Sequence, residues 1–434
     1  MISLGCNEGS MMLERKITKK LCQWKEKEER SPLVILGARG VGKTTSIIHF
    51  GKNNYLEVAY LNFEVVRELR MAFSAEMNLK EIMNCINNLI SKKIYPEETL
   101  LFFDEIQYCP VIIDIMKKIG GDFHCIAASS NLSNIEKNDL EVINMFPLDF
   151  EEFLWNVKQE NLAKKIQEAF NSNQLFCYHD VALCLFRKYL FMGGMPEVLR
   201  RYCKEEQPIF ELIRSIQHKL IESFKYNISN VARSQKINKI FKNIAGQLLT
   251  GNKKFVLAQL KNHSKYVEYE RAFKWLNSAK ITLPCYLLKD ARLPLMDNID
   301  SNSFKLYFLD CGLLNASYAI GTPVILSNYD EKDEIKMAVA ENYVAQSLLA
   351  AGFRLFYWQS SGKAKIHFVL ETKDNNIFPM EININYIPKS KRLTVFINRF
   401  SSKYGIKVTN RNFRYEGNIR EIPLYAVHCL SELN

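Results

Sequence analysis

The sequence contains no apolar run of the about 18 residues that a membrane-spanning helix requires. Its first residues, MISLGCNEGSMMLERK, lack the basic-then-apolar order of a secretory signal peptide. It also has no internal repeat and no low-complexity tract. These absences predict a soluble, cytoplasmic protein without a membrane partner.

The 11 cysteines form no C-x-x-C pair and no cluster with histidine at the spacing of a zinc site. An odd number of scattered cysteines is not the framework of a disulfide-stabilised secreted domain. We therefore expect reduced thiols, most of them buried.

Positive charge, by contrast, is plentiful and unevenly distributed. The net charge is +11, and a chain of 434 residues is expected to form two to four domains. Residues 1–158 carry 19 Lys and Arg against 22 Asp and Glu, residues 159–300 carry 23 against 13, and residues 301–434 carry 16 against 12. An excess in the middle and the tail suggests a polyanion such as DNA among the partners. A mildly basic surface without DNA binding is the alternative.

Short apolar runs recur at even intervals in the first third of the chain: PLVILG, VAYLNFE, TLLFFDE and FHCIAASS. Helical stretches such as KTTSIIHFGKN and NLKEIMNCINNLISKKI lie between them, and an amphipathic helix is expected within residues 11–30. This alternation is typical of a parallel sheet with helices on both faces.

The rest of the chain follows two other patterns. Residues 160–280 are mostly helical, with helices expected at residues 234–250, 254–262 and 265–280, followed by the strand ITLPCYLL. That order is compatible with a small winged-helix unit. A third region combines a helix near residues 337–352 with the strands FRLFYWQ, KIHFVLE and IFPMEININ.

Residues 37–44, GARGVGKT, fit the Walker A pattern G-x-x-x-x-G-K-[ST] between an expected strand and an expected helix. In such a loop, backbone N–H groups and the helix N-terminus bind phosphate oxygens. We expect Lys43 to neutralise the β and γ phosphates of ATP and the Thr44 hydroxyl to bind Mg²⁺. The predicted nucleotide-binding residues are Gly37, Ala38, Arg39, Gly40, Val41, Gly42, Lys43, Thr44 and Thr45.

The strand TLLFFDE ends in Asp104 and Glu105, as a Walker B strand does. Asp104 is predicted to hold Mg²⁺, and Glu105 to act as the catalytic base that activates water. Ser129 or Ser130, after the next strand, is a candidate sensor of the γ-phosphate, with a serine-rich turn as the alternative. Neither Arg39 nor the pair Arg200 and Arg201 has the context of an arginine finger.

With these motifs placed, the chain resembles a family of bacterial and archaeal AAA-type ATPases that carry a C-terminal domain of unknown function. The resembling stretches run in order along nearly the whole chain: ERKITKKLCQW, ILGARGVGKTT, LFFDEIQ, CIAASSNLS, PLDFEEFL, YLFMGGMPEVL, KLYFLDCGLLNA, ENYVAQSL and KIHFVLE with FPMEIN. The resemblance implies an α/β fold with an ASCE-type ATPase core, a winged-helix-like middle and a C-terminal domain similar to the PD-(D/E)xK nucleases. We expect these parts at residues 1–158, 159–300 and 301–434.

The nuclease-like part departs from its family pattern. The resemblance places the two metal-binding acids at His367 and Glu381, the lysine at Asn383 and an additional helical acid at Glu341. Histidine is a poor substitute for a hard oxygen ligand, and asparagine carries no positive charge. Glu371 or Lys365 could take over these roles, but no pattern favours that. A nuclease-like fold that is catalytically inactive is the expectation, and His367 is expected to be a partly buried strand residue.

Two basic stretches are candidates for DNA contact. The tail, IPKSKRLTVFINRFSSKYGIKV, interleaves cations with aromatic residues, and the expected winged-helix unit has cations at helical spacing. Glu268 and Glu270 lie among the latter and would repel phosphates. A solvated face is the alternative in the tail, and protein packing is the alternative in the middle. The cations are Lys389, Lys391, Arg392, Arg399, Lys403 and Lys407 in the tail, and Lys236, Lys239, Lys242, Lys265, Arg271, Lys274 and Lys280 in the middle.

Two functions remain open from the sequence. The first is a Mg²⁺-dependent ATPase that acts as a switch or motor on DNA or on a DNA-bound partner. The second is a nucleotide-dependent interaction or signalling protein, in which ATP sets domain packing or assembly into a homo-oligomer or with a protein partner. An active nuclease would be a third, and would require metal-dependent cleavage that depends on Glu381.

Overall fold

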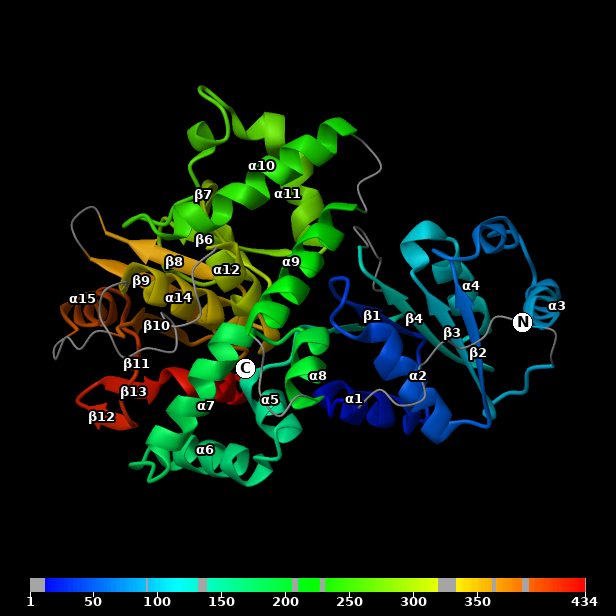
Figure 1. Cartoon of the computed structure of the whole chain (residues 1–434), viewed down its shortest axis with the longest axis horizontal. Coiled ribbons are helices and arrows are strands. Elements are labelled where there is room, and N and C mark those ends of the chain that lie inside the picture. The colour runs from blue at the N-terminus through cyan, green and yellow to red at the C-terminus, as the bar shows by residue number, and fades with distance from the viewer. Residues whose placement is uncertain are drawn as a thin grey trace. The chain divides into compact units, whose positions relative to one another are not determined.

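The computed structural model describes residues 12–90, 93–131, 139–204, 210–226, 231–318, 333–360, 364–384 and 390–433 (Figure 1). The chain divides into two compact units, which are described separately. Unit 1 is Met1–Phe146 with Ser278–Lys280, and unit 2 is Pro147–Asn277 with Ile281–Asn434. The predicted boundary after residue 300 falls inside strand β7 (Ile299–Phe308), and the division into three parts stays a prediction.

Unit 1 alternates strands and helices, as the apolar runs predict. Its helices are α1 (Lys16–Lys25), α2 (Lys43–Asn54), α3 (Leu79–Ile90) and α4 (Ile112–Ile119), and its strands are β1 (Leu33–Leu36), β2 (Glu57–Asn62), β3 (Thr99–Asp104), β4 (His124–Ser129) and β5 (Glu141–Asn144).

The strands of unit 1 form one sheet in the order β2-β3-β4-β1-β5, and every pair is parallel. The predicted parallel sheet is therefore confirmed. The register pairs Leu36 with Ser129, and Asp104 with both Asn62 and Ala128. Because parallel strands end at the same edge of a sheet, the Walker A loop, Asp104 and Ser129 lie along one edge.

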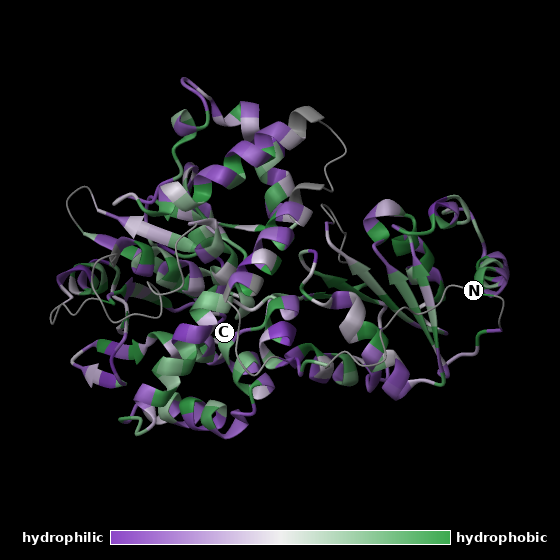
Figure 2. Ribbon diagram, viewed as in Figure 1, coloured by the Kyte–Doolittle hydropathy of each residue, from purple (hydrophilic) through white to green (hydrophobic). Residues whose placement is uncertain are grey.

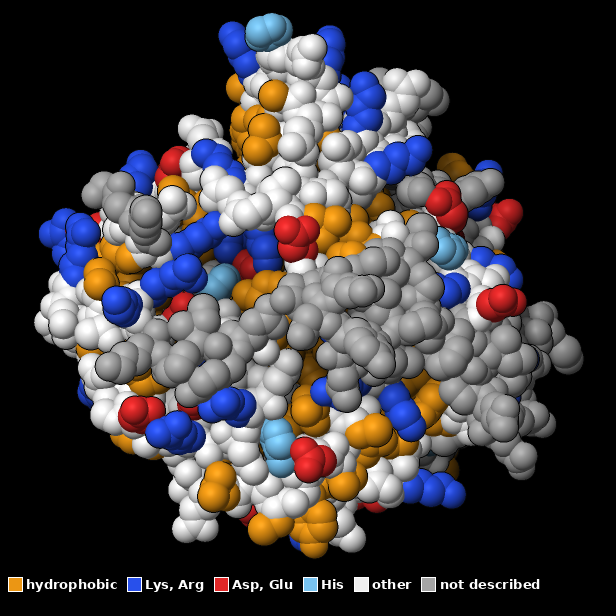
Figure 3. Space-filling model, turned by 60° about the vertical axis from the view of Figure 1, so that its left-hand side comes forward, with side chains coloured by type: hydrophobic (Ala, Val, Ile, Leu, Met, Phe, Trp, Pro, Cys, Tyr) orange, Lys and Arg blue, Asp and Glu red, His pale blue; other side chains and the backbone are white. Residues whose placement is uncertain are grey.

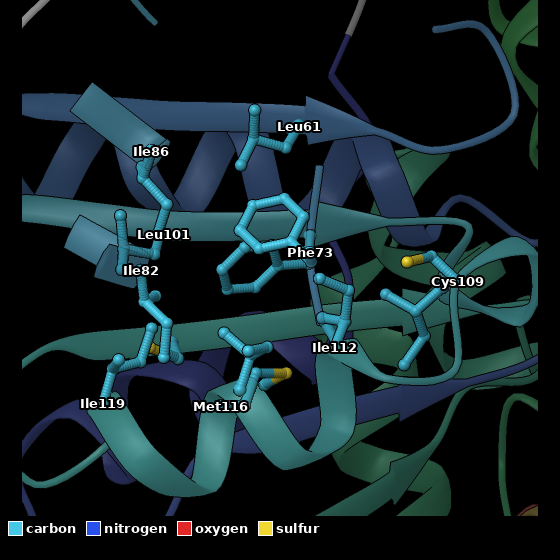
Figure 4. Close-up of a cluster of buried hydrophobic side chains, with 14 of the residues drawn as sticks. Leu61, Phe73, Ile82, Ile86, Leu101, Cys109, Ile112, Met116 and Ile119 are labelled. Carbon is cyan, nitrogen blue, oxygen red and sulfur yellow. The ribbon is translucent and has the colours of Figure 1, made fainter. Parts of the chain in front are cut away.

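Helices α3 and α4 pack on one face of this sheet through a buried apolar cluster (Figure 4). Every residue of β3 is buried, and the side chains of Leu101 and Phe103 belong to the cluster. From the helices come Ile82 and Ile86 on α3 and residues such as Met116 on α4. Helix α2 contacts β2, β3 and β4. The helices show apolar and polar residues alternating along their length, as expected for helices with one buried side (Figure 2).

Unit 2 begins with helices and continues into a second sheet. Its helices are α5 (Phe150–Asn156), α6 (Glu160–Ser172), α7 (His179–Met192), α8 (Pro196–Lys204), α9 (Phe210–Tyr226), α10 (Val231–Leu248), α11 (Tyr266–Ser278), α12 (Cys311–Ser317), α14 (Asp333–Ala350) and α15 (Lys391–Phe400). Its strands are β6 (Thr282–Leu288), β7, β8 (Phe356–Gln359), β9 (Lys365–Glu371), β10 (Ile377–Ile382), β11 (Gly405–Thr409), β12 (Arg414–Glu416) and β13 (Ile419–Pro423).

The second sheet is mixed, in the order β12-β13-β11-β10-β9-β8-β6-β7. The antiparallel hairpin β6–β7 follows α10 and α11, which is the element order of a winged helix, but β6 also pairs with β8. The hairpin is therefore part of the same sheet as the expected nuclease-like strands. The overall class is α/β, as predicted, while the winged-helix and nuclease-like assignments remain predictions.

Two of the stretches that carry the family resemblance pack closely against each other in unit 2. In YLFMGGMPEVL, Gly194 lies so near the loop before α5 that a Cβ atom would come within 1.9 Å of the Leu148 carbonyl oxygen. The Gly194 N–H donates to Asp310 of FLDCGLL at 2.6 Å, and Asp310 also caps α12 by accepting from the Leu313 N–H. These residues hold α5, α7 and α12 together, which is a structural role.

None of the helices in the described ranges is both long and apolar enough to cross a membrane.

Candidate nucleotide-binding site

The Walker A loop connects β1 to α2, and two of its three glycines have a backbone that other residues rarely adopt. The φ angles of Gly40 and Gly42 are 83° and 98°, in the left-handed region, and Gly42 is the N-cap of α2. This curl directs the loop over the N-terminus of α2, where the first N–H groups have no partner within the helix. The loop thus has the backbone shape that binds phosphate oxygens.

Lys43, the first residue of α2, turns its side chain into the loop. Its Nζ donates to the carbonyl oxygens of Gly37 at 2.8 Å and Ala38 at 3.1 Å. The side chain is buried, and this burial lowers the pKa of the ammonium group even though Glu105 and Asp104 lie near it. Carbonyl oxygens carry no net charge, so this buried ammonium group would be stabilised by an anion bound beside it.

Arg15, just before α1, holds the Walker A loop through hydrogen bonds to backbone carbonyl oxygens. It belongs to none of the nucleotide-binding motifs. One guanidinium nitrogen donates to the carbonyl oxygen of Val41 and another to that of Phe146, each at 2.8 Å. Arg15 is buried in unit 1. Its only signal in the sequence was its place in the resembling stretch ERKITKKLCQW.

Asp104 collects three polar side chains on one carboxylate oxygen, Oδ2. Thr44 Oγ1 donates to it at 2.9 Å, Tyr60 Oη at 3.0 Å and Asn62 Nδ2 at 3.3 Å. Burial, together with the neighbouring Glu105 carboxylate, raises the pKa of Asp104 to about 6. A divalent cation would favour the ionised form.

The residues predicted to hold Mg²⁺ fit that ion. Mg²⁺ prefers hard oxygen ligands, and the Thr44 hydroxyl and the Asp104 carboxylate provide them side by side next to the Walker A loop. The structure thus brings together the two predicted metal-binding residues.

Glu105 belongs to a hydrogen-bond network with Gln107 at its centre. The Gln107 amide group donates to Glu105 Oε2 and, at 3.0 Å, to Ser130 Oγ. Its carbonyl oxygen accepts from Ser129 Oγ at 2.7 Å, and Ser130 Oγ donates to Glu105 Oε2 at 3.0 Å. The predicted base and both candidate sensor serines therefore lie within one hydrogen-bonded group at the edge of the sheet.

The backbone of Glu105 is unusual. Its φ and ψ angles are 56° and 46°, in the left-handed region that non-glycine residues rarely adopt. Its N–H donates to Asp104 Oδ1 at 3.0 Å. Strain of this kind persists only where surrounding contacts enforce it, and it is concentrated at functional sites.

Sequence reasoning missed Tyr60, Asn62 and Gln107. The first two stand at alternating positions of β2, and the register places Asn62 directly beside Asp104. Polar residues at the end of the apolar run VAYLNFE were the available signal. Gln107 is part of the stretch LFFDEIQ, in which it directly follows the Walker B acids and Ile106.

The three arginines considered as arginine fingers belong to different units: Arg39 to unit 1, and Arg200 and Arg201 to unit 2. Arg39 forms an ion pair with Glu64, with 2.9 Å between Nη1 and Oε1, and its side chain is 42% exposed. Arg200 and Arg201 belong to α8 of unit 2. No arginine finger is identified among the described residues.

In unit 2, the positions of the expected nuclease centre do not form a metal site. The carboxylate of Glu341, on α14, is bound by Lys305 at 2.6 Å, by Lys253 and by the Tyr307 hydroxyl at 2.5 Å. Glu381, on β10, accepts from Ser390 and Arg392. Within the described ranges, no three His, Cys, Asp or Glu side chains are placed to hold a metal ion.

His367 is a half-buried residue of β9. Its Nδ1 accepts from the Ile382 N–H at 3.2 Å, and burial lowers the pKa of the imidazole to about 3, so the ring is neutral. The alternatives Glu371 and Lys365 are also occupied, Glu371 by the Leu295 N–H and Lys365 by the carbonyl oxygens of Gly251 and Asn252.

The predicted DNA-binding cations differ in accessibility. In the tail, Lys391, Arg392, Arg399 and Lys403 are exposed, whereas Lys407 is buried, and Lys389 lies outside the described residues. In the middle, Lys236 donates to the Glu268 carbonyl oxygen, and Lys274 pairs with Glu270. Some of this positive charge therefore serves packing within the protein.

Comparison with known proteins extends these observations. Residues 29–154 match the family described as an AAA domain, and residues 336–427 match a domain of unknown function, DUF4143. The chain joins an AAA domain to a C-terminal domain of unknown function. Between the AAA domain and this C-terminal domain, residues 184–324 match a second domain of unknown function, DUF8612. The resemblance seen in the sequence is thereby confirmed.

A curated protein that matches is the uncharacterized protein MJ1637 of Methanocaldococcus jannaschii, 23% identical over 223 residues. The match covers 47% of this chain and 46% of that protein, so the chain spans about half the length of this relative.

Similar solved structures include the Aeropyrum pernix ORC1 protein in complex with DNA, at 12% identity, with 73% of this chain and 95% of that chain covered and a TM-score of 0.35. The Thermotoga maritima RuvB Holliday junction branch migration motor is 14% identical, with 65% and 91% covered and a TM-score of 0.29. Scores this low assign neither activity nor partner.

Proposed function

We propose that this chain binds ATP with Mg²⁺ at the edge of the unit 1 sheet and hydrolyses it, and that it acts as a switch or motor on DNA. The observation that carries the ATPase part is the convergence of Lys43, Thr44, Asp104 and Glu105 at the carboxyl ends of β1 and β3. The AAA domain match over the same residues supports it.

In this proposal the N–H groups of the Walker A loop and the N-terminus of α2 bind the phosphate oxygens, and the Lys43 ammonium group leaves its carbonyl partners to neutralise the β and γ phosphates. Thr44 and Asp104 would hold Mg²⁺, which supplies charge neutralisation on the phosphates. Glu105 receives a proton from the attacking water, and Gln107 fixes the position of its carboxylate.

The ATPase part predicts different effects for two substitutions. Glu105→Gln should leave ATP binding intact and slow turnover on the order of a hundredfold or more, because the amide cannot accept the proton. Lys43→Ala should weaken ATP binding itself, because the phosphates lose their cation. Steady-state hydrolysis and ATP-binding calorimetry, both with Mg²⁺, separate these effects. Normal turnover in Glu105→Gln would show that another group is the base.

The DNA part rests on the exposed cations Lys391, Arg392, Arg399 and Lys403. A nucleotide-dependent interaction protein is the second candidate. It is favoured by the burial of Lys407 and by the bond of the exposed Lys236 to the Glu268 carbonyl oxygen, because both cations are used within the protein. Hydrolysis with and without duplex DNA, measured at several salt concentrations, distinguishes the two. Salt-sensitive stimulation by DNA supports the first, because phosphate contacts release counterions. Hydrolysis that is indifferent to DNA supports the second.

A further inference from the structure

Unit 2 contains a cluster of cations where the sequence resemblance would place a metal ion. We call Lys253, Lys305, Lys365 and Arg392 the basic cluster. Lys305 comes from β7, Lys365 from β9, Arg392 from α15, and Lys253 from the segment after α10. Lys253 and Lys305 bond to the fully buried Glu341 carboxylate of α14, whereas Arg392 pairs with Glu381. Lys365 links the two pairs, because its ammonium group interacts electrostatically with the other three cations and with Glu341.

Lys253 and Lys305 bond to the Glu341 carboxylate, which a metal ion at this position would need as a ligand. Lys305 Nζ is bonded to one oxygen of Glu341, and Lys253 Nζ to the other. Lys305 is itself fully buried, with its ammonium group 4.8 Å from the centre of the Tyr357 ring. Both oxygens of the Glu341 carboxylate are therefore taken by ammonium groups, and Glu341 is not available as a metal ligand.

The positive charge of the cluster exceeds the negative charge around it. Its four cations meet two carboxylates, Glu341 and Glu381, and the imidazole of His367 is neutral. Lys365 shows the imbalance, because burial and the nearby Lys305, Lys253 and Arg392 lower the pKa of its ammonium group to about 8. An excess of positive charge in partly buried surroundings is costly unless an anion compensates it.

Part of the cluster is within reach of a ligand. The Arg392 side chain is 48% exposed, that of Lys253 12%, and Lys365 is half-buried. The Lys365 ammonium group donates to the carbonyl and side-chain oxygens of residues 251 and 252, and these neutral oxygens do not balance its charge. Figure 3 shows a face on which Lys and Arg side chains gather beside a histidine and acidic side chains.

We propose that the basic cluster binds a phosphate group of a nucleic-acid backbone, with Lys365 and Arg392 in contact with the phosphate and Lys253 and Lys305 providing positive charge behind them. The nuclease-like strands would then hold DNA without cutting it. This inference rests on the proposed DNA role for the origin of the phosphate, but not on ATP hydrolysis. Binding is measured without ATP and Mg²⁺, so that the two proposals can fail separately.

The test compares Lys365→Ala with Lys373→Ala, an exposed lysine just after the end of β9 that lies outside the cluster. Fluorescence anisotropy with a labelled duplex, at several salt concentrations, should show roughly tenfold weaker binding for Lys365→Ala and a salt slope smaller by about one. Lys373→Ala should bind as the unmodified chain does. If Lys365→Ala does not fold, Arg392→Ala on the exposed side of the cluster takes its place, with the same expected loss.

A second arm separates the sources of the phosphate. Inorganic phosphate is titrated calorimetrically into the Lys43→Ala chain, with and without Lys365→Ala, so that the Walker A loop contributes little. Phosphate binding that requires Lys365, without any effect of Lys365→Ala on DNA, would confirm an anion site and overturn its assignment to nucleic acid. Equal behaviour of Lys365→Ala and Lys373→Ala with both probes would overturn the site itself.

Discussion

Gln107 shows how one side chain can connect two strands of a site. An amide has both a donor and an acceptor end, so it can satisfy a carboxylate and a hydroxyl at once. In unit 1 its donor end holds Glu105 and its acceptor end holds Ser129, while Ser130 bridges back to Glu105. The side chain that carries the proposed chemistry is thus positioned by the neighbouring strand.

Replacing Gln107 tests this positioning role. Gln107→Ala should lower the turnover number for ATP about tenfold while leaving ATP binding unchanged, because Glu105 keeps its carboxylate but loses its tether. The loss should be smaller than that of Glu105→Gln. Gln174→Ala, at an exposed position of unit 2, is the matched control and should turn over normally. A loss of binding equal to the loss of turnover would instead assign Gln107 to nucleotide binding.

At this scale the sequence predicts the residues that belong to a contiguous motif. Lys43, Thr44 and Asp104 meet as expected, because the Walker A loop and the strand end each fix their own residues locally. Tyr60 and Arg15 could not be predicted, because strand register and tertiary packing bring them to the site. Such contacts follow from long-range pairing, which spacing along the chain does not encode.

At the scale of elements, the four apolar runs located strands β1 to β4. The central strands β1, β3 and β4 are almost wholly buried, as expected for a parallel sheet covered on both faces. Strand β2 lies at the edge and is only alternately buried, and the edge strand β5 had no such run. The helix expected at residues 254–262 was wrong. Only a short 3-10 turn forms there, Leu257–Gln259, and the N–H of Phe255 bonds to the Phe304 carbonyl oxygen at 2.8 Å. Contact with β7 overrides the local helical pattern.

Gly194 offers a test of the contact that joins α5 to α7. Gly194→Ala should lower the stability of unit 2 by several kcal/mol, on the order expected for overpacking, because the new methyl group would collide with the Leu148 carbonyl oxygen. Gly246→Ala on α10 is the matched control. Its Cβ would meet no atom within 4 Å, so the substitution should be neutral or stabilise by up to about 1 kcal/mol. Thermal unfolding measures both, and equal midpoints would contradict the packing argument.

At the scale of the whole molecule, the chain contains two compact units with separate sheets. We therefore expect two unfolding transitions in calorimetry. ATP with Mg²⁺, at a hundredfold excess over Kd, should raise the free energy of unfolding of unit 1 by about 2.7 kcal/mol, because a ligand stabilises the unit that binds it. The midpoint temperature of that transition should rise accordingly. In Lys43→Ala this shift should be largely lost. One transition that moves as a whole would mean that the units unfold together.

The left-handed backbone of Glu105 has a consequence for how this protein can change over generations. That conformation costs a non-glycine residue about 1–3 kcal/mol, which glycine would recover. Glycine there would make the domain more robust and remove the carboxylate in the same step. At position 105 the residue that favours stability therefore differs from the residue that the proposed chemistry requires. Variants selected only for heat resistance should replace Glu105 by glycine early.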